Sequence, residues 1–220
     1  MNKAIGLFLD LDGTARESTD GKFIETPKGQ RIMAGVQEAI AHHKRQGYTI
    51  IGITNQGGCD TINRDTGKPL KSLKDAIIEQ QYTLCLIPEM EAIYFCPDMK
   101  GYKCFKVDRD NAEKIEDNTE AETHFYAISS AYDESYSTPL TRKFRKPGAG
   151  MIYRAANDFD IDLTKSWMIG DREEDEKAAI AVGLNFMWAD IWHMRFIPGM
   201  YEVRQATQQQ VEFLEGINLN

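Results

Sequence analysis

Short apolar runs alternate along the chain with longer stretches in which apolar residues recur at intervals of three and four. Residues 4–9 (AIGLFL) are apolar and lead into a polar turn that contains Gly13, which predicts a buried strand followed by a loop. Further β-rich apolar runs predict strands over residues 48–53, 92–96, 166–169 and 185–188. Helical spacing predicts helices over residues 30–46, 70–86, 149–158 and 173–182.

This alternation of strands and helices predicts the fold class, an α/β doubly wound parallel sheet with helices on both faces. Ligands of such folds bind at the carboxyl ends of the strands. The 220 residues show no internal repeat or linker, so we expect one domain over residues 1–220. Residues 97–141 interrupt the alternation as an inserted loop or partial cap, with a strand near residues 124–128. We place Trp192 and Phe196 in loops.

Composition and charge narrow the classes of protein to which the chain can belong. The formal charge of −8 argues weakly against a broad nucleic-acid surface, and residues 108–134 alone hold nine acidic and two basic residues. A basic cluster follows at Arg142, Lys143, Arg145 and Lys146. Asp10 interrupts the N-terminal apolar run far short of a signal peptide or membrane span. We therefore expect a cytoplasmic protein with reduced cysteines and no membrane contact.

Polar side chains stand at the ends of the predicted strands, where this fold class binds its ligands. Asp10 and Asp12 follow the first strand one residue apart, so that both carboxylates can act on one substrate. A carboxylate attacks phosphorus well only when a cation neutralises the phosphate, and Mg²⁺ with oxygen ligands suits that task. Taken alone, the pair also fits a turn in which Asp side chains cap the backbone.

Other strand ends carry groups that complement such a pair. Thr54 and Asn55 end the second strand and can donate hydrogen bonds to phosphate oxygens, while Lys146 offers a compact positive charge. Asp171 follows the fourth strand as a candidate metal ligand, and Asp175 lies about one helical turn later. Each group alone also fits a solvated turn or an acidic first turn of a helix. Their order along one alternating sheet makes the set specific.

Four motifs in this order resemble the haloacid dehalogenase (HAD) superfamily. They are DLDGT at residues 10–14, ITNQ at residues 53–56, RKPGAGM at residues 145–151 and GDREED at residues 170–175. The resemblance spans residues 5 to about 190 and implies a Rossmann-like sheet. Within the superfamily, TNQ combined with RKP and GM is similar to subclass III. That minimally capped subclass includes histidinol phosphatases, heptose bisphosphate phosphatases and polynucleotide 3′-phosphatases.

The resemblance implies a role in the reaction and in metal binding for three acidic residues. Asp10 would be the nucleophile and a ligand of Mg²⁺. Asp12 would be the general acid for the leaving alcohol and then the base for water, with its backbone carbonyl on the metal. Asp171 would complete the metal site.

The resemblance also implies which residues contact the substrate. The phosphoryl group would be held by Thr54, Asn55 and Lys146. Asp175 would orient Lys146 or a metal-bound water, and Arg145 and Arg172 would be further substrate contacts.

One departure from the subclass concerns zinc. Metabolite phosphatases of this subclass often carry a zinc loop that starts with Cys-x-His and ends with Cys-x-Cys just before the RKP motif. Here residues 96–98 (CPD) have Asp in place of His, and residues 141–144 contain no cysteine. Cys104 and His124 fit no regular zinc spacing, so Mg²⁺ is the only cofactor that we predict.

The resemblance implies a Mg²⁺-dependent phosphomonoester phosphatase that works through an aspartyl phosphate on Asp10. We expect a small phosphorylated substrate of the sugar phosphate or histidinol phosphate type, because the acidic insertion repels a long polyanion. The basic strip at residues 142–146 and the missing zinc ligands instead favour a nucleic-acid 3′-phosphate as the substrate. The same fold could also serve as a catalytically silent regulatory or binding domain, or as a phosphotransferase. No oligomeric state follows from the sequence.

Overall fold

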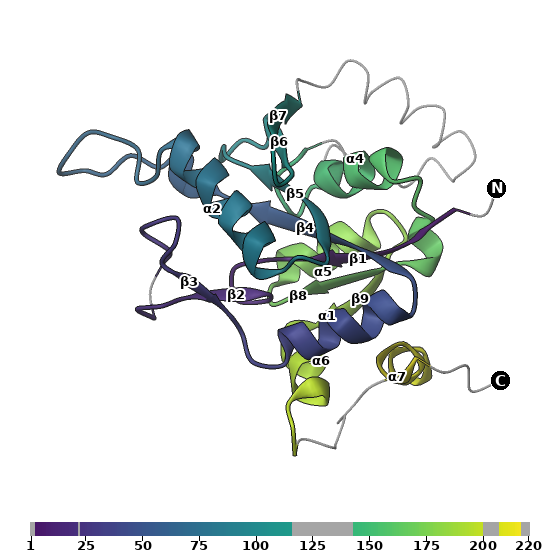
Figure 1. Cartoon of the computed structure of the whole chain (residues 1–220). Coiled ribbons are helices and arrows are strands. Elements are labelled where there is room, and N and C mark those ends of the chain that lie inside the picture. The colour runs from purple at the N-terminus through teal and green to yellow at the C-terminus, as the bar shows by residue number, and fades with distance from the viewer. Residues whose placement is uncertain (1–2, 22, 116–142, 200–206, 217–220) are drawn as a thin grey trace, which may run out of the picture.

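Five parallel strands form the centre of the protein, whose computed structural model describes residues 3–21, 23–115, 143–199 and 207–216 (Figure 1). Their order across the sheet is β5-β4-β1-β8-β9, and each neighbouring pair is parallel. The strands are β1 (Ile5–Leu9), β4 (Tyr48–Asn55), β5 (Met90–Cys96), β8 (Trp167–Gly170) and β9 (Asn185–Trp188). The predicted doubly wound sheet is confirmed, and β1 lies at the middle of its parallel part.

Both faces of the sheet are apolar and covered. In β1, Leu7 and Leu9 belong to the core on one face while Phe8 belongs to the core on the other, and none of the three has exposed surface. Successive side chains of a strand point to opposite faces, so a strand buried on both faces must be apolar at every position. This requirement is the reason why the strands stand out in the sequence as unbroken apolar runs.

Helices lie on both faces of the sheet (Figure 1). One face carries α1 (Val36–Arg45), α2 (Leu73–Leu86), α6 (Ala189–Phe196) and α7 (Gln208–Glu215). The other face carries α4 (Gly150–Asp158) and α5 (Glu173–Ile180). α2 begins where Ser72 Oγ accepts a hydrogen bond from the N–H of Asp75 at 3.0 Å. Among the described residues, no helix is long and apolar enough to cross a membrane.

The helix predicted over residues 30–46 starts later than expected. Gln30–Ile32 form strand β3, which pairs antiparallel with β2 (Arg16–Ser18) in a separate two-stranded sheet. Gly35 then adopts a φ of 82°, a left-handed conformation that interrupts a helix, and α1 begins at the next residue. The prediction was therefore wrong for residues 30–35.

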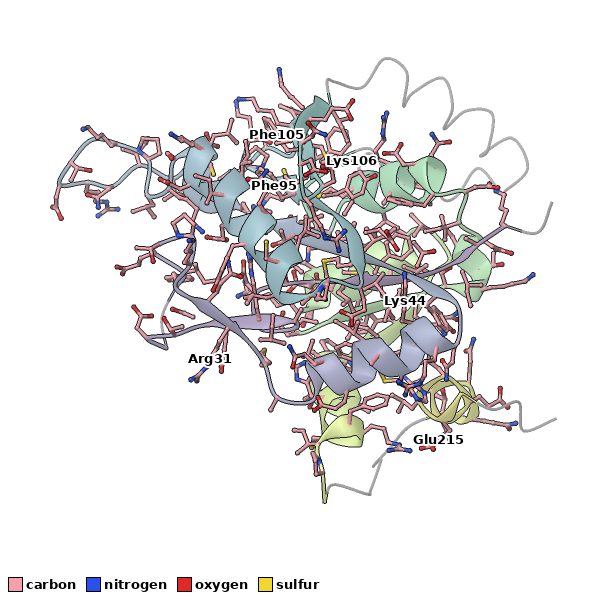
Figure 2. All side chains as sticks on the ribbon, in the orientation of Figure 1. Arg31, Lys44, Phe95, Phe105, Lys106 and Glu215 are labelled. Atoms are coloured by element: carbon pink, nitrogen blue, oxygen red, sulfur yellow. The ribbon has the colours of Figure 1, made fainter. Side chains whose placement is uncertain are left out.

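The region predicted as an insertion, residues 97–141, begins by extending the sheet. β6 (Cys104–Val107) pairs antiparallel with β5, and β7 (Ala112–Ile115) pairs antiparallel with β6, so the sheet has seven strands within the described residues. Phe95 and Phe105 stack across the first pair with ring centroids 5.3 Å apart (Figure 2). The strand predicted near residues 124–128 lies outside the described residues.

After β9 the chain forms two helices that the sequence pattern does not predict. Trp192 lies in α6 without exposed surface, and its Nε1 donates a hydrogen bond to His43 Nε2 at 3.1 Å. Phe213 of α7 stacks on His43 with ring centroids 4.3 Å apart and on Trp167 at 4.2 Å. Placing Trp192 and Phe196 in loops was wrong, because α6 (ADIWHMRF) has no clear period of apolar and polar positions yet packs on the core.

Candidate active site

The carboxyl ends of β1 and β8 bring three of the predicted acidic residues together. Asp10 follows β1, and its N–H donates a hydrogen bond to Ile169 O of β8 at 2.9 Å. Asp171 follows β8, and Asp175 lies in the first turn of α5. One carboxylate oxygen from each of Asp10, Asp171 and Asp175 lies within 4.8 Å of the other two. We call these three residues the acidic cluster.

The ammonium group of Lys146 contacts two members of the acidic cluster. Its Nζ donates hydrogen bonds to Asp10 Oδ1 at 2.5 Å and to Ile53 O at 2.9 Å, and forms an ion pair with Asp175 Oδ1 at 2.6 Å. These three acceptors match the three protons of an ammonium group. Burial lowers the pKa of Lys146, but Asp10 and Asp175 raise it above the ordinary value, so the side chain stays charged.

Negative charge nevertheless exceeds positive charge at this site. Burial is the largest cause of a pKa of about 7 at Asp10, where Lys146 lowers the value and Asp175 raises it. Burial, followed by the charge of Asp175, also raises the pKa of Asp171. With all three acids ionised, three negative charges and the one positive charge of Lys146 leave a net charge of −2.

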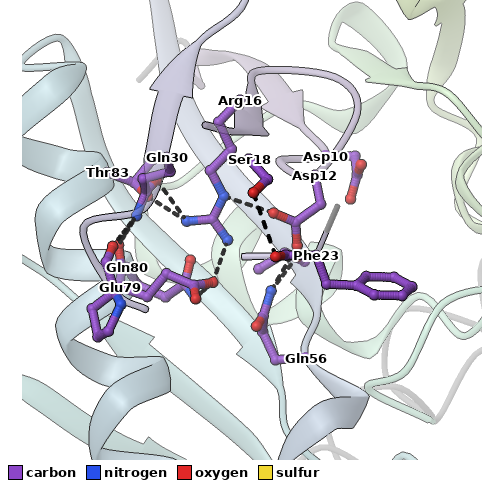
Figure 3. A network of polar contacts seen from close by, with 12 residues as sticks. Asp10, Asp12, Arg16, Ser18, Phe23, Gln30, Gln56, Glu79, Gln80 and Thr83 are labelled. Carbon is purple, nitrogen blue, oxygen red and sulfur yellow. Dashed lines mark hydrogen bonds and ion pairs between the residues drawn. The ribbon is translucent and has the colours of Figure 1, made fainter. Parts of the chain in front are cut away.

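The carboxylate of Asp12 has different partners from that of Asp10. Its Oδ1 accepts a hydrogen bond from Arg16 Nε at 2.8 Å, and its Oδ2 accepts one from Gln56 Nε2 at 2.8 Å (Figure 3). Burial is the largest influence and raises the pKa of Asp12, but the charge and hydrogen bond of Arg16, together with Lys71 and Gln56, hold that pKa below the ordinary value. The two Asp residues of the DLDGT motif thus lie in opposite electrostatic environments.

The residues at the end of β4 contact the segment that carries Lys146. Asn55 Oδ1 accepts a hydrogen bond from the N–H of Lys146 at 3.0 Å, and Asn55 Nδ2 donates one to the carbonyl of Lys146 at 3.1 Å. Thr54 is buried, and its Oγ1 accepts a hydrogen bond from Gln56 Nε2 at 3.3 Å. Asn55 therefore fixes the backbone of Lys146, a contact that the sequence motifs do not reveal.

The two arginines predicted as further substrate contacts lie in different surroundings. Arg145 is half-buried beside Gly57, and its Nη1 is buried without a hydrogen-bond partner among the residues that the structure describes. Arg172 has 66% of its side chain exposed, and its Nε lies 3.8 Å from Asp171 Oδ2. Arg145 is thus the better placed of the two to bind a polar group of a ligand.

Other polar residues beside the site were not predicted as site residues. His193 of α6 lies with Nε2 2.5 Å from Thr14 O, so a helix far along the chain contacts the loop that carries Asp10 and Asp12. Arg16 and Glu79 form a buried ion pair with an N to O distance of 2.8 Å. Their sequence separation of 63 residues leaves no local pattern by which to recognise the pair.

Comparisons with known proteins identify the family. Residues 143–189 match the model of the HAD-hydrolase-like family. The chain is 28% identical over 182 residues to D-glycero-β-D-manno-heptose-1,7-bisphosphate 7-phosphatase of Haemophilus influenzae, covering 82% of this chain and 77% of the relative. The Yersinia pestis protein of that name is 26% identical over 180 residues, covering 81% of this chain and 76% of the relative. The chain belongs to the haloacid dehalogenase superfamily.

A solved structure agrees with this assignment to the superfamily at the level of the fold. D,D-heptose 1,7-bisphosphate phosphatase from B. bronchiseptica, complexed with magnesium and phosphate, matches with a TM-score of 0.51 and 21% identity. The match covers 83% of this chain and 79% of that chain. Membership of the HAD superfamily, predicted from the four motifs, is confirmed.

The chain's own residues fit the magnesium ion that the HAD superfamily implies. The acidic cluster offers only oxygen ligands, which Mg²⁺ prefers, and its net charge of −2 matches a divalent cation. Gly13 adopts a φ of 93°, and a Cβ atom built there would lie 2.5 Å from Asp171 Oδ2. The absence of a side chain at Gly13 therefore leaves room for that carboxylate. Asp10, Asp171 and the backbone carbonyl of Asp12 are the groups that would hold the ion.

We expect Mg²⁺ to stabilise the protein more at about pH 8 than at about pH 5.5. In the folded, metal-free protein, the pKa of Asp10 is about 7 instead of 3.8, so its ionisation lowers stability as the pH rises between these values. Bound Mg²⁺ offsets that loss. Thermal unfolding with and without MgCl₂ at both pH values measures the effect. Asp171→Asn should lose most of the stabilisation by Mg²⁺. The control Asp162→Asn should retain it, because Asp162 lies near the amino end of β1, away from the acidic cluster. Equal stabilisation by Mg²⁺ at both pH values would contradict the expectation.

We expect Gly13→Ala to weaken Mg²⁺ binding through Asp171. Gly47→Ala is the matched control, because Gly47 has a φ of 87° but no atom within 4 Å of a built Cβ. Both variants should lose about 1–2 kcal/mol of stability through left-handed backbone strain. Only Gly13→Ala should lower the affinity for Mg²⁺, measured by titration calorimetry, and equal affinities in the two variants would remove Gly13 from the metal site.

Proposed function

We propose that this protein is a Mg²⁺-dependent phosphomonoester phosphatase that transfers the phosphoryl group first to Asp10 and then to water. The observation that carries this proposal is the convergence of Asp10, Lys146 and Asp171 from three separate segments of the chain. A carboxylate nucleophile, a fixed cation and a metal site with oxygen ligands are the groups that phosphoryl transfer through an acyl phosphate uses.

In the first step, a carboxylate oxygen of Asp10 attacks phosphorus while the bond from phosphorus to the ester oxygen breaks. Asp12 enters this step in its protonated form, which the second step regenerates, and gives the proton to the ester oxygen, which leaves as an alcohol. Lys146 holds Asp10 Oδ1 at 2.5 Å and so limits rotation of the attacking carboxylate. When bound at Asp10 and Asp171, Mg²⁺ supplies the positive charge that lets a carboxylate approach a phosphate group.

In the second step, water attacks the phosphorus of the aspartyl phosphate. Asp12 takes a proton from that water, and the bond between phosphorus and the Asp10 oxygen breaks. Inorganic phosphate leaves, and the carboxylate of Asp10 is restored. Arg16 and Gln56 hydrogen-bond both oxygens of Asp12 at 2.8 Å, an arrangement that stabilises the ionised form which accepts the proton.

Sugar phosphates are the substrate class that we propose. The relatives from Haemophilus influenzae and Yersinia pestis are both named heptose-bisphosphate phosphatases and align over most of this chain. Arg145 offers a buried N–H without a partner among the described residues, which suits a hydroxyl or second phosphate of a sugar.

Asp10→Asn should reduce turnover by at least about 10³-fold, because an amide keeps the shape of the carboxylate but is a poor nucleophile. Phosphate release from p-nitrophenyl phosphate measures turnover, and circular dichroism checks the fold. Asp162→Asn is the control, because Asp162 accepts a hydrogen bond from the N–H of Thr164 and lies near the amino end of β1. Turnover near the wild-type rate in Asp10→Asn would refute the mechanism, and an inactive wild type would favour a silent domain.

The substrate class predicts a higher kcat/KM for heptose 1,7-bisphosphate than for a 3′-phosphorylated oligonucleotide. The chain carries a formal charge of −8, so a long polyanion meets more repulsion than a compact ester does. Measuring kcat/KM for both substrates at low and high salt checks this expectation. A higher kcat/KM for the oligonucleotide that falls steeply as salt rises would instead support a polynucleotide 3′-phosphatase, because salt weakens contacts between a protein and nucleic-acid phosphates.

A further inference from the structure

Five side chains form a closed ring of hydrogen bonds that starts and ends at Asp12. Arg16 donates from Nε to Asp12 Oδ1 and from Nη2 to Glu79 Oε1, both at 2.8 Å (Figure 3). Lys71 Nζ donates to Glu79 Oε2 at 2.5 Å and to Gln56 Oε1 at 3.2 Å. Gln56 Nε2 closes the ring on Asp12 Oδ2 at 2.8 Å. We call these five residues the Asp12 ring.

The Asp12 ring is anchored in the protein core by Arg16 and Glu79, whose side chains are 0% and 1% exposed. Arg16 Nη1 donates further hydrogen bonds to Gln30 Oε1 at 3.2 Å and to Thr83 Oγ1. Glu79 and Thr83 lie one turn apart in α2, and Gln30 lies in β3. The guanidinium group is therefore held by two separate elements, which fixes the direction of its Nε toward Asp12.

Stability alone does not explain a buried ion pair of this kind. Two charges lose their hydration on burial, and apolar residues of similar volume often stabilise a fold equally well. The Asp12 ring holds two acids and two cations, so its formal charge is zero. Asp12 is the most exposed of its four charged side chains, with 43% of the side chain exposed. Lys71 follows with 15%. The ring thus fixes one half-exposed carboxylate from a rigid interior.

We infer that Glu79 and Lys71 are positioning residues for Asp12, acting through Arg16 and Gln56, and this inference rests on the proposed function of Asp12. A half-exposed Asp side chain on a loop otherwise populates several rotamers, and hydrogen bonds to both of its oxygens select one. Proton transfer requires the acid to lie within hydrogen-bond reach of the leaving oxygen. Loss of the selected rotamer therefore slows leaving-group protonation more than nucleophilic attack.

A comparison of two aryl esters separates this role from a general structural one. p-Nitrophenolate leaves without help from an acid, whereas phenolate is more basic and gains more from protonation. Glu79→Gln keeps the shape of Glu79, but Arg16 and Lys71 contact different oxygens, and the variant replaces one of these acceptors with an NH₂ donor that faces a cation. We expect Glu79→Gln to lower kcat/KM for phenyl phosphate by about tenfold more than for p-nitrophenyl phosphate. Asp12→Asn defines the full size of this difference.

A second pair of variants tests the less buried side of the ring. Lys71→Met removes the ammonium group and keeps the apolar stem, and it should show the same selective loss with phenyl phosphate. Lys71→Arg retains a cation and should keep most of the kcat/KM for phenyl phosphate that Lys71→Met loses. The matched control is Asp158→Asn, because Asp158 is 11% exposed and accepts hydrogen bonds from Tyr94 and Lys106 on the other face of the sheet. It should leave the ratio of the two rates unchanged.

The results of these measurements distinguish the inference from the proposed function. Equal losses with both esters in Glu79→Gln and Lys71→Met, beside a selective loss in Asp12→Asn, would overturn the inference and leave the phosphatase mechanism standing. If the wild type hydrolyses neither ester, or if Asp12→Asn shows no selective loss, the proposed role of Asp12 fails and the inference fails with it. Should Glu79→Gln not fold by circular dichroism, Lys71→Met decides the question by the same criterion.

Discussion

The buried ion pairs of Lys146 hold together a site that would otherwise repel itself. Three carboxylate oxygens within 4.8 Å of one another interact unfavourably wherever water is excluded. Lys146 contacts Asp10, Asp175 and the carbonyl of Ile53, so one ammonium group links β1, α5 and β4. It offsets only part of the negative charge, and burial, followed by the charge of Asp175, raises the pKa of Asp10 to about 7. The fold therefore favours a bound cation at the place where the proposed reaction would bind a phosphate group.

Asp10 and Asp12 lie one residue apart, yet elements on opposite faces of the sheet balance their charges. Lys146, which contacts Asp10, precedes α4 on one face, while Arg16, which contacts Asp12, is held by α2 on the other. Burial raises the pKa of Asp10 despite the nearby Lys146, whereas the pKa of Asp12 is lowered despite burial, chiefly by the charge and hydrogen bond of Arg16. The proposed nucleophile must be ionised, so Asp10 would need a cation in addition to Lys146 before it could attack. The low pKa of Asp12 suits its proposed second task, the acceptance of a proton from water.

How much the sequence can predict depends on how local each signal is. Asp10, Asp171 and Lys146 were recognisable because motifs at the strand ends mark them, and strands buried on both faces have an apolar pattern that few other elements share. The ion pair of Arg16 with Glu79 spans 63 residues, and neither position carries a local pattern that predicts burial of a charge. Strand β3 was missed because its three residues precede Gly35 in a stretch of helical spacing. Local sequence patterns do not reveal contacts between residues that are far apart in the sequence.

The Asp12 ring and the acidic cluster differ in how well their charges are balanced. This difference suits the ring to a supporting role and the cluster to binding a cation. In the Asp12 ring, each acid faces a cation and the formal charges cancel, so the ring is complete without a ligand. The acidic cluster has three carboxylates for one ammonium group and gains by binding positive charge. The closed ring lies directly beside the acidic cluster, because Asp12 belongs to the ring while the other Asp of the DLDGT motif, Asp10, belongs to the cluster.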